Sequence, residues 1–137
     1  MIYLAAPWFN PHEADTYKKV LAKLRENGEE VWAPMECIID SEQQLPNDEW
    51  AKLVFDEDIK AIDKCDKLVV LNFGMYSDTG TAWETGYAYA KQKPILMLVD
   101  DEYEATYSLM MCNGCTEINS IVNFLEDTNT ILCIEQK

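Results

Sequence analysis

The residues best suited to chemistry are two carboxylates, Asp78 and Glu84, in the stretch DTGTAWETGY at residues 78–87. The apolar run at residues 67–73 predicts a buried strand before this stretch, and a helix is predicted to follow as far as Lys91. Asp78 can cap that helix by accepting hydrogen bonds from the free N–H groups of its first turn. Because open α/β sheets bind ligands at the carboxyl ends of their strands, the two acids mark a candidate small-molecule site.

Glu84 lies between one and two turns into the predicted helix. The helix dipole favours negative charge near its N-terminus, so we expect this carboxylate to stay ionised and able to attack a sugar carbon. The simpler alternatives are a solvent-exposed Glu84 paired with a lysine and an Asp78 that only caps the helix. A third acid, Asp58, falls on the preceding predicted helix, where by itself it is typical of a surface position.

Aromatic residues accompany the first predicted strand. Tyr3 lies within it, and Trp8 and Phe9 follow in the next loop. A tyrosine hydroxyl can orient a carboxylate while an aromatic face stacks on a planar ligand, although core packing is the simpler role for each residue. The candidate site has acidic and aromatic residues but no lysine or arginine. This combination favours an uncharged ligand made of a planar nucleobase and a sugar over a phosphorylated ligand.

The sequence lacks the residues that several other functions would need. No G-x-G-x-x-G motif and no P-loop are present, and AAPWF stands after the first strand at residues 5–9. A phospho-receiver domain would need an Asp at the end of the third strand, which ends near Asn72. The single histidine, His12, is expected at the surface, which leaves a Ser-His-Asp system without support.

Five cysteines without regular spacing indicate reduced thiols and a cytoplasmic protein. Cys112 and Cys115 form a C-x-x-C pair, but the second pair that a structural zinc site needs is missing. A redox motif of this kind follows a first strand, whereas this one lies near the end of the chain. We therefore expect buried or incidental thiols and no metal site.

The composition predicts a globular domain. The chain has 137 residues, 48% of them hydrophobic, and a net charge of −14, so it would be repelled by DNA or RNA. The sequence contains no run of 18 apolar residues, so no membrane span is predicted. No basic region precedes the first apolar stretch, so no secretory signal is predicted either.

Strands and helices are predicted to alternate along the chain. Strands are expected at residues 2–6, 31–33, 67–73 and 94–99, with shorter ones at 116–118 and 131–134. Helices are expected at residues 11–26, 50–62, 79–92 and 120–125, a helical turn at 107–111 and a polar loop at 34–48. This pattern predicts an α/β fold, a flavodoxin-like doubly wound parallel sheet of about five strands with helices on both faces.

The chain resembles the nucleoside 2-deoxyribosyltransferases. The match runs in order from IYLAAPWF at residues 2–9 to SLM at residues 108–110. Its strongest part is the pattern D-x-G-x-x-x-E-x-G-Y-A at residues 78–88, which contains Gly80 between the two acids. The resemblance implies a single domain over residues 1–137 and a role in nucleoside salvage.

The resemblance also implies roles for individual residues. Glu84 would be the nucleophile, held by Tyr3. Asp58 and Asp78 would bind the base, and Asp78 would help to protonate it. Phe9 would lie against the base, with Trp8 and Gly80 among the substrate-binding residues.

The family forms oligomers in which a neighbouring subunit completes each site near the sugar 5′-hydroxyl. The resemblance therefore implies a homo-oligomer built from dimers, as large as a hexamer. The neighbour's contribution would come from Ser108 and Met110, although Ser108 stands where the family pattern has an asparagine. The implied substrates are 2′-deoxynucleosides and free nucleobases, with no metal or organic cofactor.

Two other functions are compatible with these residues. A hydrolase of the same fold would cleave deoxynucleoside 5′-monophosphates, but it needs phosphate donors that AAPWF at residues 5–9 does not supply. A non-catalytic nucleoside-binding module would use the same aromatic residues and would tolerate the loss of Glu84.

Overall fold

The structure is a computed structural model that describes residues 1–37, 46–74, 78–100 and 108–126. Its elements in chain order are β1 (Ile2–Ala5), α1 (Pro11–Glu26), β2 (Val31–Trp32), the 3₁₀ helix η1 (Pro34–Glu36), α2 (Asn47–Lys64), β3 (Lys67–Asn72), α3 (Thr79–Ala90), β4 (Ile95–Val99), α4 (Leu109–Gly114), β5 (Glu117–Ser120) and α5 (Ile121–Glu126).

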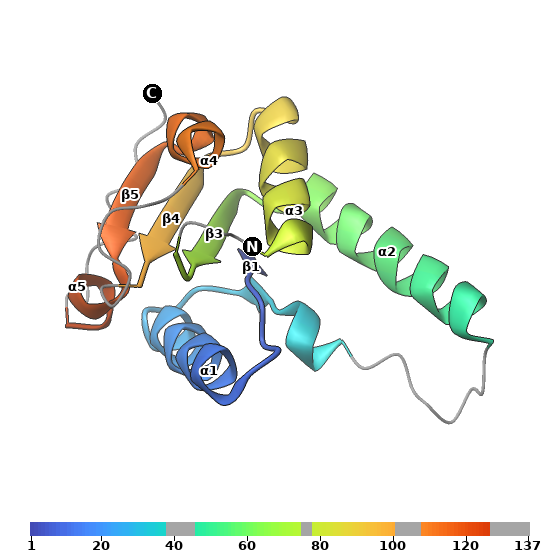
Figure 1. Cartoon of the computed structure of the whole chain (residues 1–137), viewed down its shortest axis with the longest axis horizontal. Coiled ribbons are helices and arrows are strands. Elements are labelled where there is room, and N and C mark those ends of the chain that lie inside the picture. Colours follow the sequence, from blue (N-terminus) through green and yellow to red (C-terminus); the bar gives the residue numbers. More distant parts are fainter. Residues whose placement is uncertain (38–45, 75–77, 101–107, 127–137) are drawn as a thin grey trace.

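The five strands that the structure describes form one parallel sheet in the order β2-β1-β3-β4-β5 (Figure 1). This is the flavodoxin-like order, which confirms the predicted fold class. The predicted strand at residues 131–134 lies outside the described residues. No helix in the described part of the chain is long and apolar enough to cross a membrane.

Side chains along each strand alternate between the two faces of the sheet. Leu4 and Leu71 pack into the core beneath α1 and α5, together with Leu24 and Phe124 of those helices. Tyr3 faces the opposite core, which α2, α3 and α4 cover. The central strands are almost continuously apolar because both faces of the sheet are buried, as is usual for a parallel sheet.

Two helices begin at caps that the sequence predicts. The side chain of Asn10 accepts a hydrogen bond from the Glu13 N–H at 2.8 Å, and Pro11 occupies the first turn of α1. After α1, Gly28 has a φ of +84°, a backbone conformation that favours glycine. Asp78 caps α3, as expected.

The prediction of a loop at residues 34–48 is partly wrong, because helical structure occurs at both ends of this segment. Pro34 begins η1, because a proline's fixed φ suits the first position of a helical turn. Helix α2 begins at Asn47, before the predicted start at Trp50, and the acidic residues Asp48 and Glu49 suit its first turn. Residues 38–45 lie outside the described part.

The ends of the later elements also differ from prediction. The predicted turn at residues 107–111 becomes α4 from Leu109, and the fifth strand and last helix lie at residues 117–120 and 121–126. Short elements with few apolar residues carry weak periodicity, which leaves their ends poorly specified by sequence.

Candidate active site

The strands β1 and β3 lie side by side in the sheet (Figure 1). Four of the candidate residues gather near them: Tyr3, Asp58, Asp78 and Glu84. The chain passes from β1 through α1 to β2 on one side, and from β3 through α3 to β4 on the other. The carboxyl ends of β1 and β3 therefore flank the topological switch point, where ligands bind in open α/β sheets. Tyr3 belongs to β1, while Asp78 and Glu84 come from the start and the middle of α3.

Tyr3 and Glu84 are in direct contact. The Tyr3 hydroxyl donates a hydrogen bond to Oε2 of Glu84, and the Tyr3 side chain is fully buried beneath α3. Burial and the neighbouring Glu84 charge raise the pKa of Tyr3, so the hydroxyl remains protonated and able to donate. The structure thus joins two residues that the sequence predicts to act together.

The Glu84 carboxyl is not held in its ionised form. Burial raises its pKa to about 7, and the charges of Asp58 and Asp78 act in the same direction, whereas the Tyr3 hydrogen bond lowers it. The expectation that the helix N-terminus keeps Glu84 ionised is therefore wrong, because desolvation and two neighbouring acids outweigh the dipole. Both protonation states are populated near neutral pH.

Asp58 and Glu84 line the same pocket of about 340 Å³ between α2 and α3. Gly80 lines it as well, and the other walls are mostly apolar, with Phe55 and Trp83 in edge-to-face contact at 5.5 Å between ring centroids. Asp58 is therefore no ordinary surface acid. A pocket with two acids between apolar walls can hold a flat, uncharged ligand that offers N–H groups.

Trp32 was not predicted as part of the site. It ends β2, opposite Tyr3 in the strand register, and its indole Nε1 lies 3.4 Å from Oδ1 of Asp58. Burial raises the pKa of Asp58 and the Trp32 hydrogen bond lowers it. The only sequence signal for Trp32 is its place at the carboxyl end of a predicted strand.

Asp78 serves as the N-cap of α3. Its Oδ2 accepts hydrogen bonds from the backbone N of Thr81 at 2.9 Å and from the Thr81 hydroxyl at 3.0 Å. A Cβ at Gly80 would come within 3.3 Å of the same oxygen, so a larger residue there would crowd the carboxylate. The cap fixes Asp78 close enough to Glu84 for its charge to raise the pKa of Glu84.

Trp8 and Phe9 are surface residues rather than core residues. Their rings stack on each other with centroids 5.9 Å apart, and Trp8 also meets the buried Tyr17 edge to face. Phe9 is 75% exposed, which leaves one aromatic face open to a ligand. Trp8 and Phe9 follow β1, at the same edge of the sheet as the Asp78 cap.

Ser108 and Met110 lie on the other flank of α3 from Glu84. They line a pocket of about 780 Å³ between α3 and α4, and Ser108 caps α4. Met110 is 78% exposed and Leu109 is 74% exposed. Within one chain, neither Ser108 nor Met110 lines the pocket that contains Glu84.

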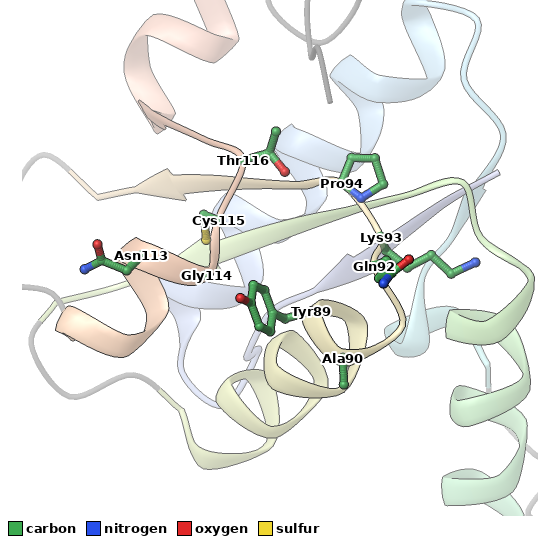
Figure 2. Close-up of a pocket in the computed structure, with 9 residues that line it drawn as sticks. All are labelled: Tyr89, Ala90, Gln92, Lys93, Pro94, Asn113, Gly114, Cys115 and Thr116. Atoms are coloured by element: carbon green, nitrogen blue, oxygen red, sulfur yellow. The ribbon is translucent and has the colours of Figure 1, made fainter. Parts of the chain in front are cut away.

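A third pocket, of about 690 Å³, lies at the opposite end of the sheet (Figure 2). Its residues Lys93 and Thr116 precede β4 and β5, so it is remote from the switch point. The Lys93 ammonium donates to the backbone carbonyls of Asp63 and Cys65 at 2.9 and 2.8 Å, which leaves it a structural role.

His12 lies at the surface, as the sequence predicts. His12 is half exposed, and its Nε2 lies 2.6 Å from Oδ2 of Asp100, a pairing that was not predicted. Burial raises the pKa of Cys115 to about 12, so its thiol is a poor nucleophile. The four described cysteines are unpaired, and no described group of three or more His, Cys, Asp or Glu residues is placed to bind a metal.

The strand order defines a flavodoxin-like α/β fold, and the acid-lined pocket between α2 and α3 is its candidate small-molecule site. A sequence model of the nucleoside 2-deoxyribosyltransferase family matches residues 2–131. The chain belongs to this family, which confirms the resemblance found in the sequence. No curated protein gives a significant sequence match.

Solved structures agree with this assignment. A 2-deoxyribosyltransferase from Bacillus psychrosaccharolyticus is 28% identical with a TM-score of 0.81, and the match covers 99% of this chain and 98% of that one. A conserved protein from Enterococcus faecalis V583 is 20% identical with a TM-score of 0.73, covering 95% and 97%. A CMP N-glycosidase from Clostridium botulinum is 22% identical with a TM-score of 0.61, covering 91% and 93%. The last two similarities establish the fold alone.

Tyr3→Phe should raise the pKa of Glu84 above its value of about 7. The substitution keeps the ring in the core but removes the hydrogen bond that lowers this pKa. The expected rise is on the order of one unit, measured by an NMR titration of the Glu84 carboxyl carbon. Tyr17→Phe is the matched control, because the Tyr17 hydroxyl bonds the backbone of Met35 instead. An unchanged Glu84 titration in Tyr3→Phe would contradict the assigned contact.

Proposed function

We propose that the protein transfers the 2-deoxyribosyl group between purine or pyrimidine bases of 2′-deoxynucleosides, as in nucleoside salvage. The observation that carries this is the contact of Tyr3 with Glu84, whose side chain lines a pocket together with Asp58. Family membership and the 28% identity to a 2-deoxyribosyltransferase over almost the full chain support the activity.

In the first step, ionised Glu84 attacks the anomeric carbon as the bond to the base breaks, through an oxocarbenium-like transition state. The product is a deoxyribosyl ester of Glu84. Asp78, or a water that it holds, gives a proton to the leaving base. Tyr3 orients the nucleophile, Asp58 accepts an N–H group of the base, and Phe9 covers its face.

In the second step, another base attacks the same carbon while its N–H proton passes back to Asp78, and Glu84 is released as a carboxylate. Two displacements retain the configuration and give ping-pong kinetics. Substrates without a 2′-hydroxyl form the oxocarbenium-like state more easily, which suits 2′-deoxynucleosides. No step calls for a metal or an organic cofactor.

The second candidate is a nucleotide N-glycosidase, because a CMP N-glycosidase shares the fold. A 5′-phosphate needs N–H donors, and helix N-termini are their usual source. At the start of α1, however, the Glu13 N–H is bonded to Asn10, and the Phe9 N–H is bonded to the Glu13 carboxylate at 3.1 Å. This acidic, capped turn disfavours a phosphate and favours an uncharged nucleoside.

We also propose that a second copy of the chain completes each site, as part of a homo-oligomer built from dimers. Ser108 and Met110 line a pocket apart from Glu84 in their own chain, and Met110 and Leu109 are strongly exposed. Covering these side chains would remove apolar surface from water and would bring Ser108 and Met110 toward a neighbour's sugar 5′-hydroxyl.

The test is chromatographic product analysis with 2′-deoxyinosine as the donor, with and without adenine or cytosine. Transfer predicts hypoxanthine together with a new deoxynucleoside of the added base. Hypoxanthine and free deoxyribose alone would instead show a hydrolase. If neither product forms, cleavage of deoxynucleoside 5′-monophosphates would favour the nucleotide glycosidase, and nucleoside binding without cleavage would favour a non-catalytic module.

A further inference from the structure

Trp32 connects the edge of the sheet to the Asp58 side of the pocket. It ends β2, and its side chain packs against the core beneath α2 and α3, where Tyr3 is also buried. From there its indole N–H donates to Oδ1 of Asp58 at 3.4 Å. A strand residue thus holds a carboxylate that belongs to a helix.

Asp58 has few groups that favour its charge. The titratable groups around it are Glu57 on α2, Glu84 on α3, Tyr3 on β1 and Cys37 after η1, and none of them is a cation. Within the described residues, no lysine or arginine forms an ion pair with Asp58. The Trp32 N–H is therefore the one described donor that favours the ionised carboxylate.

The hydrogen bond to Trp32 uses only Oδ1. Among the described residues, Oδ2 of Asp58 accepts no hydrogen bond, and the Asp58 side chain lines the pocket. An ionised carboxylate is an acceptor only, so its second oxygen can bind an N–H group of a ligand but repels a lone pair.

We propose that Trp32 is a positioning residue that holds Asp58 with Oδ2 directed at the base, so that Asp58 selects bases carrying an exocyclic amino group. This role rests on the proposed function. It makes the Trp32–Asp58 pair a specificity determinant, with Trp32 acting through Asp58 rather than touching the base.

The experiment compares adenine with unsubstituted purine, which lacks the amino group, as acceptors from 2′-deoxyinosine. In the parent protein, KM for purine should exceed KM for adenine by about tenfold or more, as expected for a hydrogen bond to a charged group. Trp32→Phe and Asp58→Asn should each remove most of this ratio, and the double variant should lose no more than Asp58→Asn alone.

A pH profile separates positioning from packing. Without the indole N–H, the pKa of Asp58 should rise, so the preference of Trp32→Phe for adenine should recover partly at higher pH. Replacing Trp32 with benzothienylalanine, in which sulfur replaces the ring N–H, keeps the shape and should reproduce the effect. Tyr87→Phe is the control, because it removes a donor to another α2 carboxylate, Asp63, and should leave the preference unchanged.

The same proteins should be titrated with free adenine and free purine by calorimetry, which needs no turnover. If the parent transfers to neither base, the proposed function fails, while the binding ratios still decide the role of Trp32. Trp32 has no such role if its variants keep the adenine preference that Asp58→Asn loses, if the two losses add in the double variant, or if the parent does not distinguish the two bases.

Discussion

Glu84→Gln should lower the rate of deoxyribosyl transfer on the order of a thousandfold or more. Glutamine keeps the size of the side chain and can still accept the Tyr3 hydrogen bond, but its amide cannot form the glycosyl ester. Chromatography of the products measures the rate, and mass spectrometry of the parent protein with donor alone should reveal a deoxyribosyl adduct on Glu84. Turnover at the parental rate in Glu84→Gln would exclude Glu84 as the nucleophile.

The same variant should be more stable than the parent at pH 8, which shows that the lost activity is not a folding defect. The Glu84 pKa is about 7 in the folded protein against an ordinary value of 4.5, so the folded state binds the proton more tightly. The stability that Glu84 contributes is complete below pH 4.5 and is lost as the pH rises through 7. Glutamine does not titrate, so the difference in Tm between variant and parent should increase from pH 5 to pH 8.

Asp78→Asn should reduce kcat by about 10²–10⁴-fold with little loss of stability. Asparagine caps helices as well as aspartate does, so it can still accept the Thr81 N–H, but it cannot protonate a leaving base. The diagnostic substrate is 7-methyl-2′-deoxyguanosine, whose base already carries a positive charge and leaves without a proton.

With that substrate, the loss caused by Asp78→Asn should be much smaller than with 2′-deoxyinosine. An equal loss with both donors would mean that Asp78 binds substrate or shapes the site but is not the general acid. Thermal unfolding of the variant serves as the control, since a broken cap would lower Tm by itself.

The central strands could be predicted from sequence almost to the residue. The predictions at residues 2–6, 67–73 and 94–99 each differ from the observed strand by a single position. Apolar runs of strand length with polar or proline boundaries specify such buried strands locally. The caps at Asn10 and Asp78 were predictable for the same reason, because a cap depends only on neighbouring backbone.

The electrostatics of the site could not be predicted in this way. Burial and two acids from different elements set the pKa of Glu84, and neither is visible along the chain. Trp32 and Asp58 are also distant in sequence, and they meet only because β2 pairs with β1 beside α2. The sequence thus predicts candidate reactive residues, whereas the protonation of Glu84 depends on tertiary packing.

The contact between Tyr3 and Glu84 joins residues 81 positions apart, one in β1 and the other in α3, the helix that follows β3. Parallel strands need long crossovers, and contacts between distant parts of a chain form slowly during folding. Tyr3 can therefore orient the Glu84 carboxylate only when the middle of the sheet is complete. We therefore expect an unfinished chain, in which β3 and α3 are missing, to lack the Tyr3–Glu84 contact altogether.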